Sequence, residues 1–248
     1  GDQLTIEATV TDTTGVNSVT ADASAFDAGT VTLTATGGDT YHRTVSVGES
    51  PTEGDQSLTV SATDTESNGG GQAVRTGTLT VDITPPTTSD DTATASEDTT
   101  GTQLVTDLRT NDEDAVSTET DLEVTAVDGN SNNVATAVTG TNGGQFTVTT
   151  DGEVTFDSAG DFESLGGGEA ASTSVAVTVA DEAGNEATEM ILTTVQGVND
   201  APTDLSLADT IVSQSAGSDA PVGALSATDQ DGDALAYSLA PSTGDADN

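Results

Sequence analysis

Three aspartates alternate with other residues near the end of the chain, in the stretch ATDQDGDALAYSL (227–239). Asp229, Asp231 and Asp233 lie two positions apart beside a glycine, a spacing that can turn several carboxylate oxygens toward one point. Ca²⁺ takes about six to eight oxygen ligands, so the stretch is a candidate calcium loop. It is not an EF-hand, because Ala234 and Ala240 stand where that loop needs Gly and Glu.

The sequence offers little for catalysis. His42 is the single histidine, and neither Cys nor Lys occurs. No G-x-S-x-G, H-E-x-x-H or phosphate-binding glycine motif is present. Paired carboxylates in glycosidases work in clefts that are lined with aromatic side chains, and aromatics make up 2% of this chain. We therefore expect no enzymatic activity in this segment.

Carboxylates must be positioned by a fold, and the composition at first argues against one. The 248 residues carry a net charge of −40, and 32% are hydrophobic, which is a composition typical of disorder. However, runs such as LTIEATVTD, GTVTLTATG and TSVAVTVAD alternate apolar residues with Thr, Ser or acids. This period of two in Val- and Thr-rich segments predicts half-buried β-strands, so we expect an all-β protein.

The acidity has two compatible explanations. Molar salt screens charges within about 3 Å, and the lack of lysine favours adaptation to such salt. The other explanation is a large set of divalent-cation ligands. A polyanion does not attract nucleic acid or anionic membranes, and no apolar run reaches the roughly 18 residues of a membrane span. Without Cys, no disulfide can hold a module together.

Two breaks that contain proline divide the chain, because proline is excluded from central strands. They are TPPTTSDD (84–91) and VNDAPTD (198–204). The predicted modules are 1–84, a β-sandwich that lacks its first strand, 85–200, a complete sandwich, and 201–248, the start of another. This predicts tandem β-sandwich modules, and a window cut from a longer array. Alternatively, strands of neighbouring copies complete the end modules, as in a filament.

Several ordered pieces resemble a known family. FTVTTDGEVTFD (146–157), DFESLGGGE (161–169), VTVADEAGN (177–185) and GVNDAP (197–202) are similar to the VCBS-type repeats of large prokaryotic surface adhesins. The stretches 90–129 and 227–239 resemble cadherin-like modules, and the first module, which ends in GTLTVDITPP, looks like an Ig-like surface repeat of bacteria or archaea. The resemblance implies tandem Ig-like or cadherin-like β-sandwich modules, arranged as beads on a rod in a long extracellular protein, with Ca²⁺ at the module junctions.

At the second junction, the resemblance implies that Asn199 and Asp200 supply oxygens from the linker while Asp229, Asp231 and Asp233 supply them from the next module. The alternative is that NDAP and DQDGD are ordinary polar turns, since Asn, Asp, Gly and Pro are the usual turn residues.

The first junction has a less complete pattern, because Ala115 and Val116 replace the expected D-G-D. Its candidate ligands are Asp90, Asp91, Glu97, Asp98, Asp112, Asp114, Asp121, Asp181 and Asn185.

We therefore expect a structural or adhesive segment of a large extracellular repeat protein, such as a cell-surface stalk, fibre or biofilm adhesin, with Ca²⁺ stiffening its junctions. The alternatives are a virus tail fibre or host-recognition module, and a non-catalytic accessory region of a secreted hydrolase. The expected partners are neighbouring repeats or copies of the same protein, and glycans or proteins of cell surfaces or matrix, without nucleic acid or membrane insertion.

Overall fold

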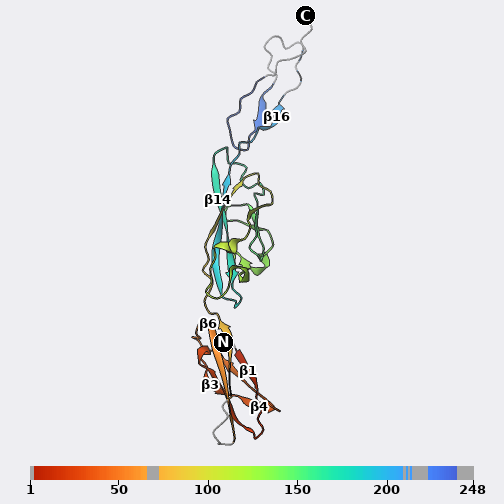
Figure 1. The fold of residues 1–248 in the computed structure, drawn as a ribbon. Coiled ribbons are helices and arrows are strands. Elements are labelled where there is room, and N and C mark those ends of the chain that lie inside the picture. The colour runs from red at the N-terminus through yellow and green to blue at the C-terminus, as the bar shows by residue number, and fades with distance from the viewer. Residues whose placement is uncertain (1–2, 66–72, 209–210, 212, 214–222, 239–248) are drawn as a thin grey trace. The chain divides into compact units, whose positions relative to one another are not determined.

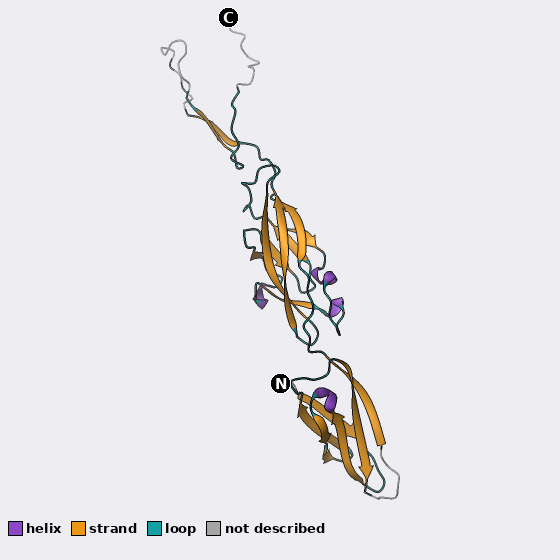
Figure 2. Cartoon of the chain, turned by 90° about the vertical axis from the view of Figure 1, so that its left-hand side faces the viewer, coloured by secondary structure: helices purple, strands orange, loops and turns teal. Residues whose placement is uncertain are grey.

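Strands dominate the structure, a computed structural model that describes residues 3–65, 73–208, 211, 213 and 223–238. The helices of the described residues are short 3₁₀ turns, η1 (Ser24–Phe26), η2 (Leu108–Asn111), η3 (Glu119–Asp121) and η4 (Ser131–Asn133), drawn purple in Figure 2. The predicted all-β sandwich fold is confirmed.

The chain divides into two compact units. The first comprises residues 1–87 together with 112–122 and 180–187, and the second comprises 88–111, 123–179 and 188–248. The predicted breaks at the prolines fall between strands, and the module boundaries given above stay predictions.

The first unit holds two facing antiparallel sheets (Figure 1), ordered β1–β5–β4 and β3–β2–β6–β7. Their strands are β1 (Gln3–Thr9), β2 (Val16–Ala23), β3 (Gly29–Thr32), β4 (Thr34–Gly37), β5 (Thr40–Ser46), β6 (Gly54–Asp64) and β7 (Ala73–Val81). Alternation positions the core, because every second side chain of a strand points inward. On β2, Val19, Ala21 and Ala23 are thus buried and pack with Ile6 and Phe26.

The second unit contains a sandwich of two four-stranded sheets, ordered β10–β14–β15–β8 and β11–β12–β13–β9. Their strands are β8 (Asp91–Ser96), β9 (Thr102–Val105), β10 (Glu123–Val127), β11 (Val138–Thr139), β12 (Gln145–Val148), β13 (Val154–Asp157), β14 (Ala170–Ala180) and β15 (Glu186–Gln196). The first of these strands, β8, runs parallel to the last, β15, with Asp91 opposite Ile191 and Ser96 opposite Gln196.

Three phenylalanines fill the core of this sandwich. Phe146 and Phe156 lie opposite one another on β12 and β13, with their ring centroids 4.9 Å apart. Phe162 packs against Phe156 at 6.5 Å. Such large apolar side chains supply much of the burial in a chain that has few of them.

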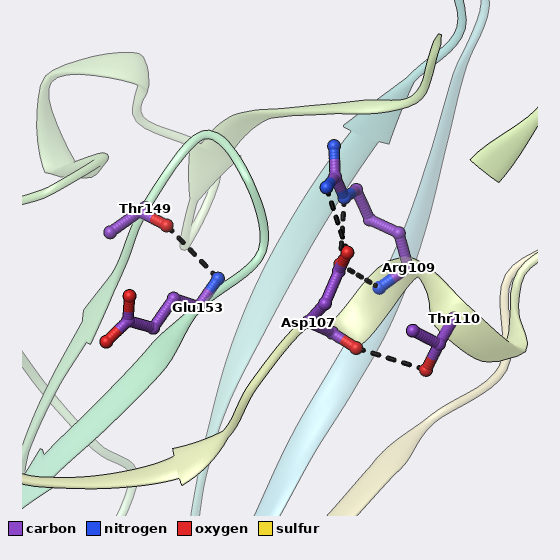
Figure 3. A network of polar contacts seen from close by, with 5 residues as sticks. All are labelled: Asp107, Arg109, Thr110, Thr149 and Glu153. Carbon is purple, nitrogen blue, oxygen red and sulfur yellow. Dashed lines mark hydrogen bonds and ion pairs between the residues drawn. The ribbon is translucent and has the colours of Figure 1, made fainter. Parts of the chain in front are cut away.

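A partly buried ion pair lies within the loop after β9, and a backbone hydrogen bond ties this loop to the β12–β13 turn (Figure 3). Arg109 donates from Nε to Asp107 Oδ1 at 2.8 Å and from Nη2 to Oδ2 at 2.9 Å, and Thr110 donates to the Asp107 carbonyl. The Leu108 N–H donates to the Gly152 carbonyl. Gly152 has φ of +80°, and a Cβ there would lie 2.6 Å from Asp107 Oδ1, so only glycine suits this turn.

Beyond this sandwich, β16 (Thr203–Leu207) and β17 (Leu225–Thr228) form a two-stranded antiparallel sheet. A register shift between Thr203 and Ser206 interrupts its pairing. The candidate calcium loop 229–233 follows β17 directly. This sheet therefore brings the loop back toward the start of β16, where residues 197–202 leave β15.

Candidate cation sites

Glu97 is the most deeply buried carboxylate among the described residues, with 1% of its surface exposed. It follows β8, and its N–H donates to the Gln196 carbonyl at the end of β15. Its Oε1 accepts the N–H of Val198 at 2.6 Å, whereas Oε2 is buried and has no hydrogen-bond partner. Burying a carboxylate oxygen without a partner is costly, so this oxygen is a candidate ligand for a cation.

Asp200 and Asp231 complete a group around that oxygen. The Asp200 N–H donates to Asp231 Oδ2 at 2.7 Å, which ties the linker to the 229–233 loop. Asp200 Oδ2 and Asp231 Oδ1 are buried and also lack partners. Glu97, Asp200 and Asp231 each bring one carboxylate oxygen within 4.8 Å of the other two. Like charges this close repel one another unless a cation or a proton lies between them.

The loop 229–233 forms a second, overlapping group. Asp229, Asp231 and Asp233 also bring oxygens within 4.8 Å of one another. The Asp233 N–H donates to Asp229 Oδ1 at 3.1 Å, and Gly232 adopts φ of +75° to close the turn. Asp231 therefore belongs to both groups and is the residue that they share.

Glu163, in the turn after β13, adds negative charge to the same region. Burial raises the pKa of Glu163, and the negative charges of Asp200, Asp98 and Glu97 raise it further. Gln230 Nε2 donates to Glu163 Oε2 at 3.4 Å. Several negative charges thus surround Glu97, as a cation site requires.

The first unit contains a separate group, formed by Asp82, Asp114 and Asp181 with oxygens within 4.8 Å of one another. Asp114 Oδ1 accepts the N–H groups of Val116 and Ser117 at 2.9 and 2.7 Å, while its Oδ2 is buried without a partner. Burial raises the pKa of Asp82, and the charges of Asp181 and Asp114 add to this effect.

Asp181 in this group is fully engaged locally. Its Oδ1 accepts the backbone N–H of Asn185 and its Oδ2 accepts that residue's side-chain amide, both at 2.9 Å. This group is therefore a weaker candidate cation site than the one around Glu97.

The structure redistributes the ligand candidates named from the sequence. Asp231 lies with Asp229 and Asp233 in one group and with Asp200 in another, and this second group includes Glu97, which was assigned to the first junction. Asp114 and Asp181 come together in the first unit. The ligand assignments themselves stay predictions.

The other named residues serve local contacts. Asn199 is exposed and donates to the Asp200 carbonyl, and Asp121 accepts from Thr118. Asp90 accepts the Met190 N–H, the exposed Asp98 donates from its N–H to Ser96 Oγ, Asp91 begins β8, and Asp112 is buried in the first unit.

Sequence reasoning missed Asp82 and Glu163. Asp82 precedes Pro85 much as Asp200 precedes Pro202, and this parallel was a usable signal. The alternation in TATASE also places Glu97 on the buried side of its strand, in phase with Ala95. Glu163 gives no comparable signal, because its position depends on a turn rather than on a strand.

Comparison with known proteins gives a partial picture. No family model matches the chain. Halomucin of Haloquadratum walsbyi is 49% identical over 75 residues, a match that covers 28% of this chain and 1% of halomucin.

Similar solved structures are cadherin ectodomains and a bacterial adhesin. Chicken VE-cadherin EC1-2 has a TM-score of 0.37 at 13% identity, covering 79% of this chain and 92% of that one. Human desmocollin-1 has 0.35 at 12% identity, covering 92% and 39%. A bacterial ice-binding adhesin has 0.37 at 17% identity, covering 79% and 57%.

In the part of the chain that the structure describes, no helix has the length and apolar character needed to cross a membrane.

Proposed function

We propose that this chain is a structural or adhesive segment of a large extracellular repeat protein, and that Ca²⁺ bound by Glu97, Asp200 and Asp231 holds the β16–β17 sheet onto the sandwich of the second unit, called the middle sandwich below. The observation that carries the proposal is the Glu97 carboxylate, which is 1% exposed and keeps one oxygen without a partner beside two further carboxylates.

The donor set fits a hard divalent cation. All three side chains offer oxygen, whereas zinc and copper prefer nitrogen or sulfur ligands, and this chain has one histidine and no cysteine. Ca²⁺ accepts irregular arrangements of carboxylates and carbonyls, while Mg²⁺ demands near-octahedral geometry. A bound Ca²⁺ would supply positive charge that offsets the repulsion among the carboxylates. Glu97 comes from the sandwich, Asp200 from the linker and Asp231 from the following loop, so the ion would restrain all three segments together.

Two further observations support the extracellular assignment. The similarity to part of halomucin, a haloarchaeal surface protein, relates this chain to a class of surface proteins. The net charge of −40 without lysine suits a protein exposed to concentrated salt. Repeats or copies of the same protein, and glycans or proteins of other surfaces, are the partners we assign to such a segment.

Calcium titration tests the cation directly. In molar KCl, which screens the surface charge, isothermal titration with CaCl₂ should show saturable binding by the wild-type chain. Glu97→Gln and Asp231→Asn keep the shape and one acceptor oxygen but remove charge, and each should weaken binding about tenfold or more, the scale of losing one charged ligand. Glu123→Gln is the matched control, because Glu123 is exposed at the start of β10 and belongs to none of the three carboxylate groups. Absence of saturable binding, or equal loss in the Glu123 variant, would contradict the site.

A further inference from the structure

Exposed apolar side chains gather at two places in the described part of the chain. Nine large hydrophobic residues are exposed there, and seven of them lie either at the end of β7 or in and around the β16–β17 sheet. These seven are Leu79, Ile83, Leu205, Leu207, Ile211, Leu225 and Tyr237. Single exposed apolar residues are normal on a protein surface, whereas gathered ones mark interaction sites. Both places are therefore candidates for contact with a partner.

The first place is the free edge of the β3–β2–β6–β7 sheet. β7 is the last strand of that sheet, and its residues 75–80 are all exposed. Residues 76–81 carry no charge, although 43 of the 248 residues of the chain are acidic. Proteins usually guard an edge strand with charges, proline or a bulge, and this stretch has none of these. The open edge of β7 can therefore pair with a further strand.

A cavity of about 760 Å³ lies beside this edge, within the first unit. Its apolar lining includes Leu4 of β1, Phe26 of η1 and Ile83. Leu79 also lines it and points to the same side of β7 as Val81, which packs on the core. Pockets that enclose a ligand have volumes of about 300–1,000 Å³, so this one can receive side chains of a partner.

The second place is the sheet of β16 and β17. Leu207 lies opposite Leu225, so both point to one face, and they are 38% and 42% exposed. Leu205, on the same strand as Leu207, is 70% exposed. Among the described strands, β16 pairs with β17 alone and has a second, free edge. A two-stranded sheet is marginally stable by itself, so a third strand and apolar contacts would stabilise it.

The two free strands also carry opposite charges. Arg75 on β7 is exposed and forms no ion pair with a described carboxylate. Asp204 on β16 is exposed as well. Copies of a chain with a net charge of −40 repel one another over most of their surface. The β7 edge combines an uncharged stretch with a cation, which lowers that repulsion for an approaching β16.

We infer that copies of this chain associate head to tail, with β16 of one copy adding to the free edge of β7 in the next copy. Leu205 and Leu207 then enter the cavity beside Leu79. This inference rests on the proposed function and deepens it, because it names the surfaces through which copies of the protein meet. The contact joins two different surfaces, so each pair of copies still has one of each free. Repeated, it builds an open chain of copies unless the rotation between them closes a ring.

Sedimentation velocity of the whole chain tests the contact. Protein from micromolar to millimolar concentration is run in molar KCl, which screens the charge repulsion, at constant CaCl₂. The mean mass of the wild type should rise with concentration beyond that of a dimer. Leu79→Glu and Leu205→Glu should each stay monomeric, because pairing would bury an unpaired charge in an apolar cavity. Leu192→Glu is the matched control and should associate like the wild type, since Leu192 is also 42% exposed but lies on β15.

A mixture of two variants decides which surfaces meet. Leu79→Glu keeps an intact β16 and Leu205→Glu keeps an intact cavity. An equimolar mixture should therefore form dimers with one copy of each and nothing larger. A mixture that stays monomeric would overturn the inference. Association of either variant alone would overturn it too, because the contact would then join two like surfaces, and so would a wild type that stays monomeric throughout.

Urea unfolding monitored by circular dichroism checks that each variant is folded. Leu79→Ser removes the apolar side chain without adding a charge, and it replaces Leu79→Glu in the mixture if that chain does not fold. A monomeric wild type that binds calcium in the titration would refute the contact between copies and leave the proposed cation site standing. A chain that associates as expected but binds no calcium would refute the cation site and leave the contact standing.

Discussion

The carboxylate of Glu97 accepts a hydrogen bond from the backbone of Val198, 101 positions later in the chain, at 2.6 Å. This contact joins the end of the first strand of the middle sandwich to the residue that follows its last strand. Because the bond uses one oxygen, the second oxygen of the same buried group is left for another partner. One side chain thus joins the two ends of the sandwich and keeps a second oxygen for the proposed cation.

The shared residue Asp231 should matter more for calcium affinity than Asp233. Asp231 belongs to both overlapping groups, whereas Asp233 belongs to one and is exposed. We expect Asp231→Asn to weaken binding about tenfold or more and Asp233→Asn by a few-fold, as the number of charged ligands falls. Isothermal titration of the two variants side by side checks the order, and equal effects would contradict the shared role.

Gly197→Ala should destabilise the second unit. The added methyl group collides with the Leu165 and Gly166 carbonyls, and overpacking of this kind costs about 1–3 kcal/mol of unfolding free energy. Gly77→Ala is the matched control, because no atom lies within 4 Å of a Cβ there and Gly77 is exposed. Urea unfolding monitored by circular dichroism measures both variants. An unchanged unfolding free energy for Gly197→Ala would show that the Leu165 and Gly166 carbonyls leave room for a methyl group at position 197.

Asp82→Asn should stabilise the first unit in the presence of EGTA. The charges of Asp181 and Asp114 contribute to the raised pKa of Asp82, so removing its charge relieves repulsion. The expected gain is about 1 kcal/mol or less, the scale of a partly exposed charge pair, and it should shrink in molar KCl. Thermal unfolding at low and high salt measures this gain in stability. Asp39→Asn, at an exposed position, is the control. A loss of stability in EGTA would contradict the repulsion.

The Asp107–Arg109 pair should contribute to acid sensitivity. The hydrogen bonds from Arg109 lower the pKa of Asp107. A carboxyl group whose pKa is lowered by folding stabilises the folded state at every pH above its ordinary pKa, which is near 3.9. This contribution is lost as the pH falls through the lower pKa of the folded state. Asp107→Asn should therefore be roughly 1–2 kcal/mol less stable than the wild type at neutral pH, with the gap closing below about pH 4.

Urea titrations between neutral pH and pH 3 in chelator measure this gap. Glu123→Gln, at the exposed start of β10, controls for the general loss of charge on acidification. A gap that stays constant down to pH 3 would show that the ion pair does not carry the pH dependence.

Much of the fold could be predicted from the sequence because alternation is a local property. In runs such as TSVAVTVAD, the alternation itself indicates which side chains point inward, and Val175, Val177 and Val179 are indeed buried. The prolines of both breaks lie between strands for an equally local reason, since proline cannot complete a ladder. The loop 229–233 was also visible, because all its carboxylates lie within five residues.

The composition of the carboxylate groups could not be predicted in the same way. Glu97 was assigned by its nearness in sequence to the first break, but β8 runs parallel to β15 and carries Glu97 to the opposite end, beside Gln196. Strand direction depends on which strands pair across the sandwich, and a single sequence does not state that. Asp82 and Asp181 meet across 99 positions for the same reason.

The parallel pairing of β8 with β15 also has a mechanical consequence. The chain enters this ladder near Asp91 and leaves it near Gln196, at opposite ends of two strands that point the same way. Tension applied through the polypeptide on either side would therefore load the hydrogen bonds of the ladder lengthwise, in shear, so that they must fail together instead of opening one after another. The middle sandwich is built to resist pulling along its own strands.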